Sequence, residues 1–445
     1  MRNRRALLVS RTLVTGVACS LLALVLGSSQ AAAEPEPPGR VPAAAPVSGS
    51  SVVVDWMRTA SATIQAEKIL PPEALILNAY VSTAVYNAVV GIEGHYTLYK
   101  WQERGPQGAS SAAAAASAAH HLLRHYFPSA APQLDAARAD TLAAIPDGWA
   151  EDAGVAFGEN AAAHIIDLRR DDGRGAPVPY TTPPAPGTWR PTPPANEPFA
   201  TAWAAKVRPM LLDSPQQFRP EPPPTLTSAR YTKDFDEVKT YGAKSSSLRT
   251  PEQTDTARFF ASLDLQQALG DHALRHGMDI TRTARLYAAA NTSQADAVIT
   301  AWDAKLHYAT WRLITAIRLA DTDNNPATHP DQQWEPLLTT PAHPDYLSGH
   351  ATMGGALMQA LTKLFNTPCV DLNIHSTSTG AYRHYQHADE YNRDVINARV
   401  WAGIHTRTAD TVGNTTGRRV AAWALERYFQ PIPPIPGGYV QERGP

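Results

Sequence analysis

Lys305 and Arg312 are two basic residues seven positions apart, in a segment that also holds His307, Tyr308 and Trp311. Seven residues make two turns of an α-helix to within about 20°, so both cations would lie on one face of a continuous helix. Two fixed cations beside aromatic rings indicate an anion site. The pair alone would suit a solvated basic stripe equally well, and we expect the three aromatic residues to pack between helices.

Ser348, Gly349 and His350 open a second helical segment, the apolar stretch 351–365. The start of a helix presents unsatisfied backbone N–H groups and the positive end of the helix dipole, which favour a bound oxyanion. Gly349 lets the backbone approach such an anion closely, and Ser348 can cap the helix and donate a hydrogen bond. His350 can act as an acid or a base near neutral pH. Such a tripeptide is common, so it is weak evidence by itself.

Arg399 and His405 form a third element, with Gly403 between them. The planar guanidinium of Arg399 suits a tetrahedral oxyanion. Six positions on an unbroken helix would turn the two side chains about 240° apart. We therefore expect the backbone to leave the regular helix near Gly403, so that both side chains face one point. Considered alone, His405 fits a structural histidine better than a ligand.

Together, these elements resemble the signature shared by vanadium haloperoxidases and the related acid phosphatases of the phosphatidic acid phosphatase type 2 superfamily. That signature is a lysine with an arginine seven positions on, then Ser-Gly-His, then an arginine with a histidine six positions on. The helices, the proline-rich region and residues 303–318 also resemble secreted bacterial homologues of the vanadium-dependent haloperoxidases. The resemblance therefore covers much of the chain.

The resemblance implies a vanadate cofactor. Its oxygens would be bound by Lys305, Arg312, Ser348, Gly349 and Arg399. His405 would bond the metal, His350 would be the acid-base residue, and Lys305 would polarise a bound peroxide, so these three are the implied catalytic residues. The implied activity uses hydrogen peroxide to oxidise a halide by way of peroxovanadate and halogenates a small organic acceptor, with the metal as a Lewis acid.

Four positions depart from the family pattern. Leu313 and Leu347 replace two prolines, and Ala398 stands where a serine is frequent; none of these three supplies a ligand. The acid expected four residues after the metal-binding histidine is displaced by one position, to Asp410. If that acid normally orients His405, its support is in doubt here.

Trp302 and His343 occupy positions where haloperoxidases line the halide side of the pocket. At the place of His343, fungal chloroperoxidases carry phenylalanine and algal bromoperoxidases carry histidine, so we predict that bromide and iodide are oxidised in preference to chloride. The alternative is that His343 only forms hydrogen bonds within the turn 341–344.

Two other functions fit the same motif. In an acid phosphatase, His405 would form a phosphohistidine and His350 would protonate the leaving group. A non-catalytic protein would keep the pocket only to bind an anion. The resemblance over the rest of the chain and the aromatic lining at Trp302 favour the haloperoxidase.

Helical periodicity dominates the sequence, and strand-like alternation is nearly absent. We therefore expect an all-α fold, a large helical-bundle protein; its division into two four-helix-bundle-like units is implied partly by the resemblance. Residues 51–172 form the N-terminal helical part and residues 225–430 the C-terminal part that carries the site. Helical patterns run through 110–127, 155–168, 251–269, 280–317, 349–365 and 392–429.

Residues 173–224 contain too many prolines for a helix or a central strand. We expect this segment to form a long irregular wrap over the helices. Its apolar anchors would be Trp189, Phe199, Trp203 and Phe218.

Residues 1–33 resemble a signal peptide, with early arginines, an apolar stretch over 13–26 and a small-residue cleavage site near Ala33. The pair Arg4-Arg5 also resembles a twin-arginine signal. We therefore expect a secreted protein without a stable membrane anchor. Residues 34–50 should form a disordered linker, and residues 431–445 a proline-rich tail.

The composition limits the remaining classes. A formal net charge of −2 does not suit a nucleic-acid-binding protein. The two cysteines are Cys19, inside the expected signal, and Cys369, so the mature chain has no partner for an internal disulfide. The sequence specifies neither the organic acceptor nor the oligomeric state.

Overall fold

The computed structural model describes residues 49–433, and helices dominate this part of the chain. The all-α expectation is confirmed. The expected signal peptide, nearly all of the linker and most of the proline-rich tail lie outside the described residues.

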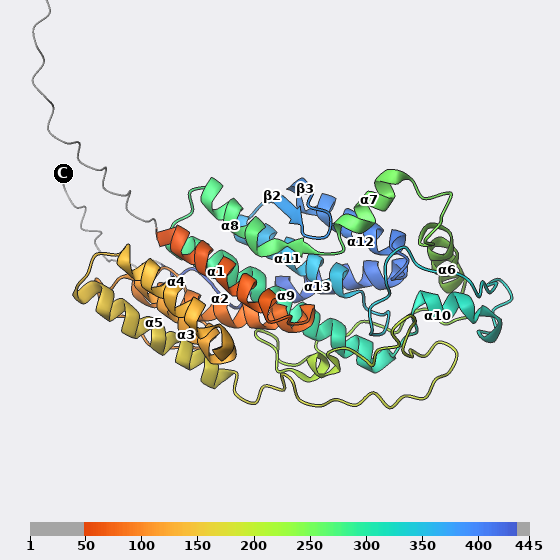
Figure 1. Ribbon diagram of the computed structural model, residues 1–445, viewed down its shortest axis with the longest axis horizontal. Coiled ribbons are helices and arrows are strands. Elements are labelled where there is room, and N and C mark those ends of the chain that lie inside the picture. Colours follow the sequence, from red (N-terminus) through yellow and green to blue (C-terminus); the bar gives the residue numbers. More distant parts are fainter. Residues whose placement is uncertain (1–48, 434–445) are drawn as a thin grey trace, which may run out of the picture. The chain divides into compact units, whose positions relative to one another are not determined.

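Five helices form the N-terminal part of the fold (Figure 1): α1 (Gly49–Ala66), α2 (Pro71–Glu93), α3 (Ser111–Tyr126), α4 (Ala131–Ala143) and α5 (Trp149–Leu168). Helix α2 is apolar all round and packs against α1, α3, α5 and α9. Among the described helices it alone is long and apolar enough to cross a membrane, but it is a core helix whose apolar window is 89% buried.

Eight helices form the C-terminal part: α6 (Ala229–Tyr241), α7 (Pro251–Phe259), α8 (Leu265–Arg275), α9 (Ile280–Tyr308), α10 (Leu313–Arg318), α11 (Gly349–Phe365), α12 (Ala388–Trp401) and α13 (Arg407–Leu425). Helix α9 joins the two parts, because it contacts α2 on one side and α11 and α13 on the other (Figure 1). Helices α11 and α13 approach closely at Gly417, where an added Cβ would lie 1.8 Å from the Thr352 carbonyl oxygen. This close packing fixes the N-terminal end of α11.

The proline-rich segment 173–224 contains a short 3₁₀ helix at Ala202–Lys206 and is otherwise irregular. It is tied to α9 by two carboxylates. Asp296 accepts hydrogen bonds from the backbone N–H groups of three consecutive residues, Met210, Leu211 and Leu212, at 2.6–2.8 Å. Asp303 accepts two from Arg219, at 2.6 and 2.7 Å. The wrap is therefore anchored along the helix that also carries Lys305.

Three long helical patterns are interrupted, and of these breaks only the one near Gly403 was expected. The pattern 280–317 breaks after Tyr308, where Ala309 adopts a left-handed conformation with φ of 47°. There the Ala309 carbonyl accepts a hydrogen bond from the Trp189 N–H of the wrap, at 2.6 Å. The other two breaks separate α7 from α8 and α12 from α13. A contact with a distant segment accompanies the break at Ala309, so local periodicity did not reveal it.

A three-stranded antiparallel sheet corrects the expectation that strands are nearly absent. Its strands are β1 (Leu263–Asp264), β2 (Cys369–Ser376) and β3 (Tyr382–His387), in the order β1-β2-β3. The side chains of β2 alternate in burial, with Val370, Leu372 and Ile374 inside. The sequence pattern was therefore present but too short to stand out.

Candidate oxyanion site

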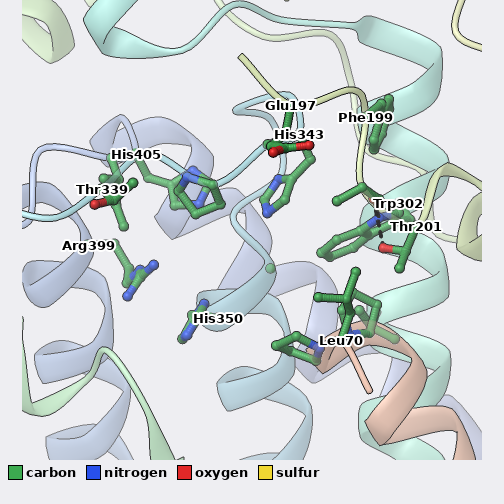
Figure 2. A pocket seen from close by; sticks show the side chains of 18 of the residues that line it. Leu70, Glu197, Phe199, Thr201, Trp302, Thr339, His343, His350, Arg399 and His405 are labelled. Carbon is green, nitrogen blue, oxygen red and sulfur yellow. Dashed lines mark hydrogen bonds between the residues drawn. The ribbon is translucent and has the colours of Figure 1, made fainter. Parts of the chain in front are cut away.

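Four segments meet at the candidate site: the end of α9, the start of α10, the start of α11 and the turn between α12 and α13. Figure 2 shows His343, His350, Arg399 and His405 gathered around one space. The predicted residues Lys305, Arg312 and Ser348 are fully buried beside them. The three sequence elements are thus brought together.

Lys305 lies on α9, and its ammonium group is fully buried. Nζ donates hydrogen bonds to the carbonyl oxygens of Pro344 and Asp345, at 2.6 and 3.1 Å, and lies 5.5 Å from the centre of the Trp302 ring. An ammonium has three donors, so one remains for a ligand. Burial, reinforced by the neighbouring cation Arg312, holds the pKa of Lys305 well below its usual value.

Arg312 reaches the site by a route different from the predicted one. It precedes α10 and follows the break at Ala309, so it does not share a continuous helix with Lys305. Its guanidinium donates to the carbonyl oxygens of His343 and Ile404. The same group lies 3.4 Å from both ring nitrogens of His405. Burial lowers the pKa of Arg312 to about 10, so it stays charged at neutral pH.

The N-terminal end of α11 forms the floor of the site. Ser348 is the N-cap, and its hydroxyl lies 3.5 Å from the Ala351 N–H. An added Cβ at Gly349 would lie 3.1 Å from the Trp302 ring, so glycine keeps this surface open. The pKa of His350 is well below its usual value because of burial and the nearby Arg399, while a hydrogen bond with the Ala261 carbonyl raises it.

Arg399 lies near the end of α12. Nη1 donates to the Phe260 carbonyl oxygen at 3.2 Å. Its Nε is buried and has no hydrogen-bond partner among residues 49–433. A buried donor without a partner is costly, and a bound anion would satisfy it. Burial lowers the pKa of Arg399 to about 10, against the opposing effect of Asp410.

Gly403 makes the predicted departure from helical geometry. Helix α12 ends at Trp401, and Gly403 has φ of 78°. An added Cβ there would lie 2.3 Å from the Gly242 carbonyl oxygen, so both the conformation and the close approach require glycine. The resulting turn brings His405 to the same chamber as Arg399.

Asp345 is the functional residue that the sequence analysis missed. Its Oδ1 lies 2.6 Å from Nδ1 of His405, and its Oδ2 accepts a hydrogen bond from the Thr406 hydroxyl at 2.9 Å. This contact places the imidazole proton on Nδ1 and leaves the Nε2 lone pair available. The position of Asp345, three residues before Ser348, could have drawn attention to it. Nothing in the sequence pairs this acid with His405, which is sixty positions away.

Asp410, the acid considered as support for His405, occupies a different position. Both of its carboxylate oxygens are buried and have no hydrogen-bond partner in the described part of the chain. Burial raises the pKa of Asp410 well above its usual value, and Asp345 adds to this; Ser348 and Arg399 act in the opposite direction. Asp345, not Asp410, contacts His405.

His343 forms contacts beyond its own turn. Its Nδ1 accepts a hydrogen bond from Arg312 Nη2 at 2.9 Å, and its ring centre lies 4.8 Å from that of Trp302. Burial and the cations Lys305 and Arg312 hold the pKa of His343 well below its usual value. The same causes act on His405. Both rings are therefore neutral at physiological pH.

The charge balance of the site favours an anion. Lys305, Arg312 and Arg399 converge in a buried space, whereas the pKa of Asp410 is raised well above the ordinary range and that of Asp345 to about 6. Fixed cations, a helix N-terminus and an unpaired guanidinium N–H suit a tetrahedral oxyanion. His405 Nε2 offers such an anion a neutral nitrogen ligand or nucleophile.

Comparisons with known proteins match part of the chain in sequence and most of it in fold. Residues 285–433 match the family described as the VCPO second helical-bundle domain. Vanadium chloroperoxidase of Curvularia inaequalis is 33% identical over 93 residues, which cover 19% of this chain and 15% of that protein. The match thus spans less than a fifth of either chain.

Solved structures resemble the chain over a greater length. A bacterial vanadium-dependent iodoperoxidase has a TM-score of 0.74 at 24% identity, covering 85% of this chain and 96% of that chain. The apo form of a bacterial vanadium-dependent chloroperoxidase has a TM-score of 0.64 at 20% identity, covering 80% of this chain and 94% of that one. Its holo form gives 0.64 at 19% identity, covering 80% and 92%.

The fold and the site define a helical-bundle protein with an oxyanion pocket at the start of α11. Residues 285–433 thus match the VCPO second helical-bundle domain, and the chain shares its fold with bacterial vanadium-dependent haloperoxidases.

Proposed function

We propose that the protein is a vanadium-dependent haloperoxidase, which uses hydrogen peroxide to oxidise a halide and halogenates an organic acceptor. The observation that carries the proposal is the pairing of His405 with Asp345, which leaves a neutral Nε2 facing three buried cations. A metal-binding histidine needs this arrangement of its second nitrogen. The chloroperoxidases and the iodoperoxidase named above, which the chain resembles, support the same activity.

The residues present fit vanadate. Lys305 has one donor left over after its two backbone contacts, and Arg399 has an unpaired buried Nε. Together with Arg312, Ser348 and the Gly349 N–H, these groups would hold the vanadate oxygens, and His405 Nε2 would be the ligand to the metal. When bound, vanadate supplies Lewis acidity that activates hydrogen peroxide without a change in the oxidation state of the metal.

The remaining chemistry falls to the side chains. His350 lines the site and has a pKa well below its usual value, so its ring can take a proton from hydrogen peroxide and return it later. The remaining N–H of Lys305 can polarise the oxygen that the halide attacks. Trp302 and His343 form the halide side, where we propose that bromide and iodide are favoured over chloride.

Export completes the proposal. The signal-like residues 1–33 support secretion, by a route that the pair Arg4-Arg5 suggests is the twin-arginine pathway. N-terminal sequencing of the protein recovered from culture medium tests this. We expect the secreted protein to begin near residue 34. Protein that stays inside the cell with residues 1–33 still attached would contradict secretion.

The activity is tested with two assays in parallel. Purified protein is supplied with vanadate, hydrogen peroxide, bromide and a dione acceptor in one assay, and with an aryl phosphate in the other. We expect vanadate-dependent bromination, abolished in His405→Ala. Phosphate release without bromination would overturn the proposal in favour of the phosphatase, and the absence of both would favour a non-catalytic anion-binding protein.

A further inference from the structure

A chamber of about 840 Å³ adjoins the oxyanion site. Its walls come from the start of α2, the wrap at 197–201, helices α9 and α11, and the loop 338–343. The rim contains Leu70, whose exposed fraction is 49%, and the exposed residues Glu197 and Thr339 (Figure 2). A ligand of drug-like size fits a space of this volume.

The walls are apolar away from the oxyanion site. Leu70, Phe199, Val298, Leu338 and Met353 are among the lining residues. The ionisable lining residues are Glu197 at the exposed rim and four members of the site itself: His343, His350, Arg399 and His405. With an anion held at those four residues, the part of the chamber wall that the structure describes offers little that would stabilise a charged ligand. It favours an uncharged, apolar one.

The walls are held in place by specific contacts. The Ala200 N–H donates to the Ala342 carbonyl oxygen at 2.7 Å, and Trp302 Nε1 donates to the Ala200 carbonyl oxygen at 3.3 Å. The Phe199 ring packs against Trp189, with 5.5 Å between centres. The wrap is therefore fixed to α9 and to the loop at 338–343, so a ligand would enter a preformed space.

We propose that this chamber binds the organic acceptor, an uncharged apolar compound, so that halogenation takes place while the acceptor is bound beside the oxyanion site. The inference rests on the proposed haloperoxidase function. Hydrogen peroxide takes two electrons from bromide and its O–O bond breaks; with one proton taken up from solvent, water and hypobromous acid form. The acceptor then gains a C–Br bond and loses a C–H bond, and the released proton joins the hydroxide of hypobromous acid as water.

Binding can be tested without turnover. Calorimetry measures the affinity of 1-naphthol for vanadate-saturated protein in the absence of peroxide. We expect saturable binding of 1-naphthol. Leu70→Trp and Thr339→Trp should each weaken this binding about tenfold, because the bulky tryptophan side chain narrows the rim. Leu248→Trp is the matched control, since Leu248 is 62% exposed and lies outside the chamber lining. Using two rim variants guards against one that fails to fold.

The product ratio supplies an independent readout. With 1-naphthol, we expect the wild-type enzyme to give a ratio of 2-bromo to 4-bromo product that differs from the ratio given by hypobromous acid in buffer. In the rim variants, this ratio should shift toward that of the free reagent. No saturable binding, equal affinity in all variants, or the ratio of the free reagent overturns the inference. Failure to brominate with rim-sensitive binding intact would overturn the proposed function while supporting the apolar chamber.

Discussion

Nδ1 of His405 lies 2.6 Å from Oδ1 of Asp345, and both side chains are buried. The acid comes from the loop before α11 and the histidine from the turn before α13, so the contact joins two of the three sequence elements. It also fixes which nitrogen of His405 faces a ligand. The pair is therefore central to the proposed function.

Replacing Asp345 by Ala should weaken vanadate binding by about 10–100-fold, because His405 loses the group that holds its proton on Nδ1. Vanadate titration by calorimetry measures the effect. Asp345→Asn should retain part of the affinity, since its amide oxygen can accept the same hydrogen bond. Asp213→Ala, at an exposed position in the wrap, is the control. An affinity unchanged in Asp345→Ala would contradict the assigned role.

Asp345 should also make stability depend on pH. Burial raises its pKa to about 6, against a value near 3.9 in an unfolded chain. The folded state thus favours the protonated form, and this contribution to stability is present below pH ~4 and lost as the pH rises through about 6. For vanadate-free protein, the contribution should fall by about 1–2 kcal/mol between pH 5 and 7.5.

Urea unfolding of the wild type and of Asp345→Asn at pH 5 and 7.5 measures this pH-dependent contribution to stability. The difference between the two proteins in free energy of unfolding should change by that amount. Asp213→Asn controls for the general effect of removing a carboxylate. A difference that stays constant between the two pH values would show that Asp345 has no raised pKa.

Gly403→Ala should destabilise the fold by about 2–4 kcal/mol, because a Cβ would meet the Gly242 carbonyl oxygen in a left-handed backbone conformation. Gly380→Ala is a matched control. Gly380 also has positive φ, 71°, but an added Cβ meets nothing within 4 Å, so its cost should be about 1–2 kcal/mol. Equal losses in thermal or urea unfolding would argue against a close approach at Gly403.

We propose that the halide preference depends on His343, which contacts both Arg312 and Trp302. Vanadate-loaded wild-type protein should brominate and iodinate a dione acceptor at least about tenfold faster than it chlorinates it. Steady-state rates with the three halides at equal concentration provide the measurement. If the enzyme chlorinated the acceptor as fast as it brominated it, the predicted halide selectivity and its assignment to His343 would be wrong.

The sequence predicted which elements meet at the candidate site better than it predicted the backbone that carries them. The start of α11 could be predicted because Ser348, Gly349 and the apolar stretch after them are neighbours in sequence. The break at Ala309 could not, because alanine favours helix and the interruption depends on a hydrogen bond from Trp189 of the wrap. Arg312 consequently reaches the site from a separate segment.

Long-range partners account for the other differences. Asp345 was missed because its partner His405 is sixty positions away, and Asp410 drew attention because it is near in sequence. The hairpin of β2 and β3 was missed because three buried residues, Val370, Leu372 and Ile374, are too few to distinguish a strand within a helical chain.

A crystal structure of the protein soaked with vanadate shows whether His405 binds the metal. We expect vanadium bonded to Nε2 of His405, with its oxygens contacted by Lys305, Arg312, Arg399 and the N-terminal end of α11. Vanadate bound elsewhere, or His405 Nε2 directed away from it with the site otherwise intact, would exclude His405 as the ligand.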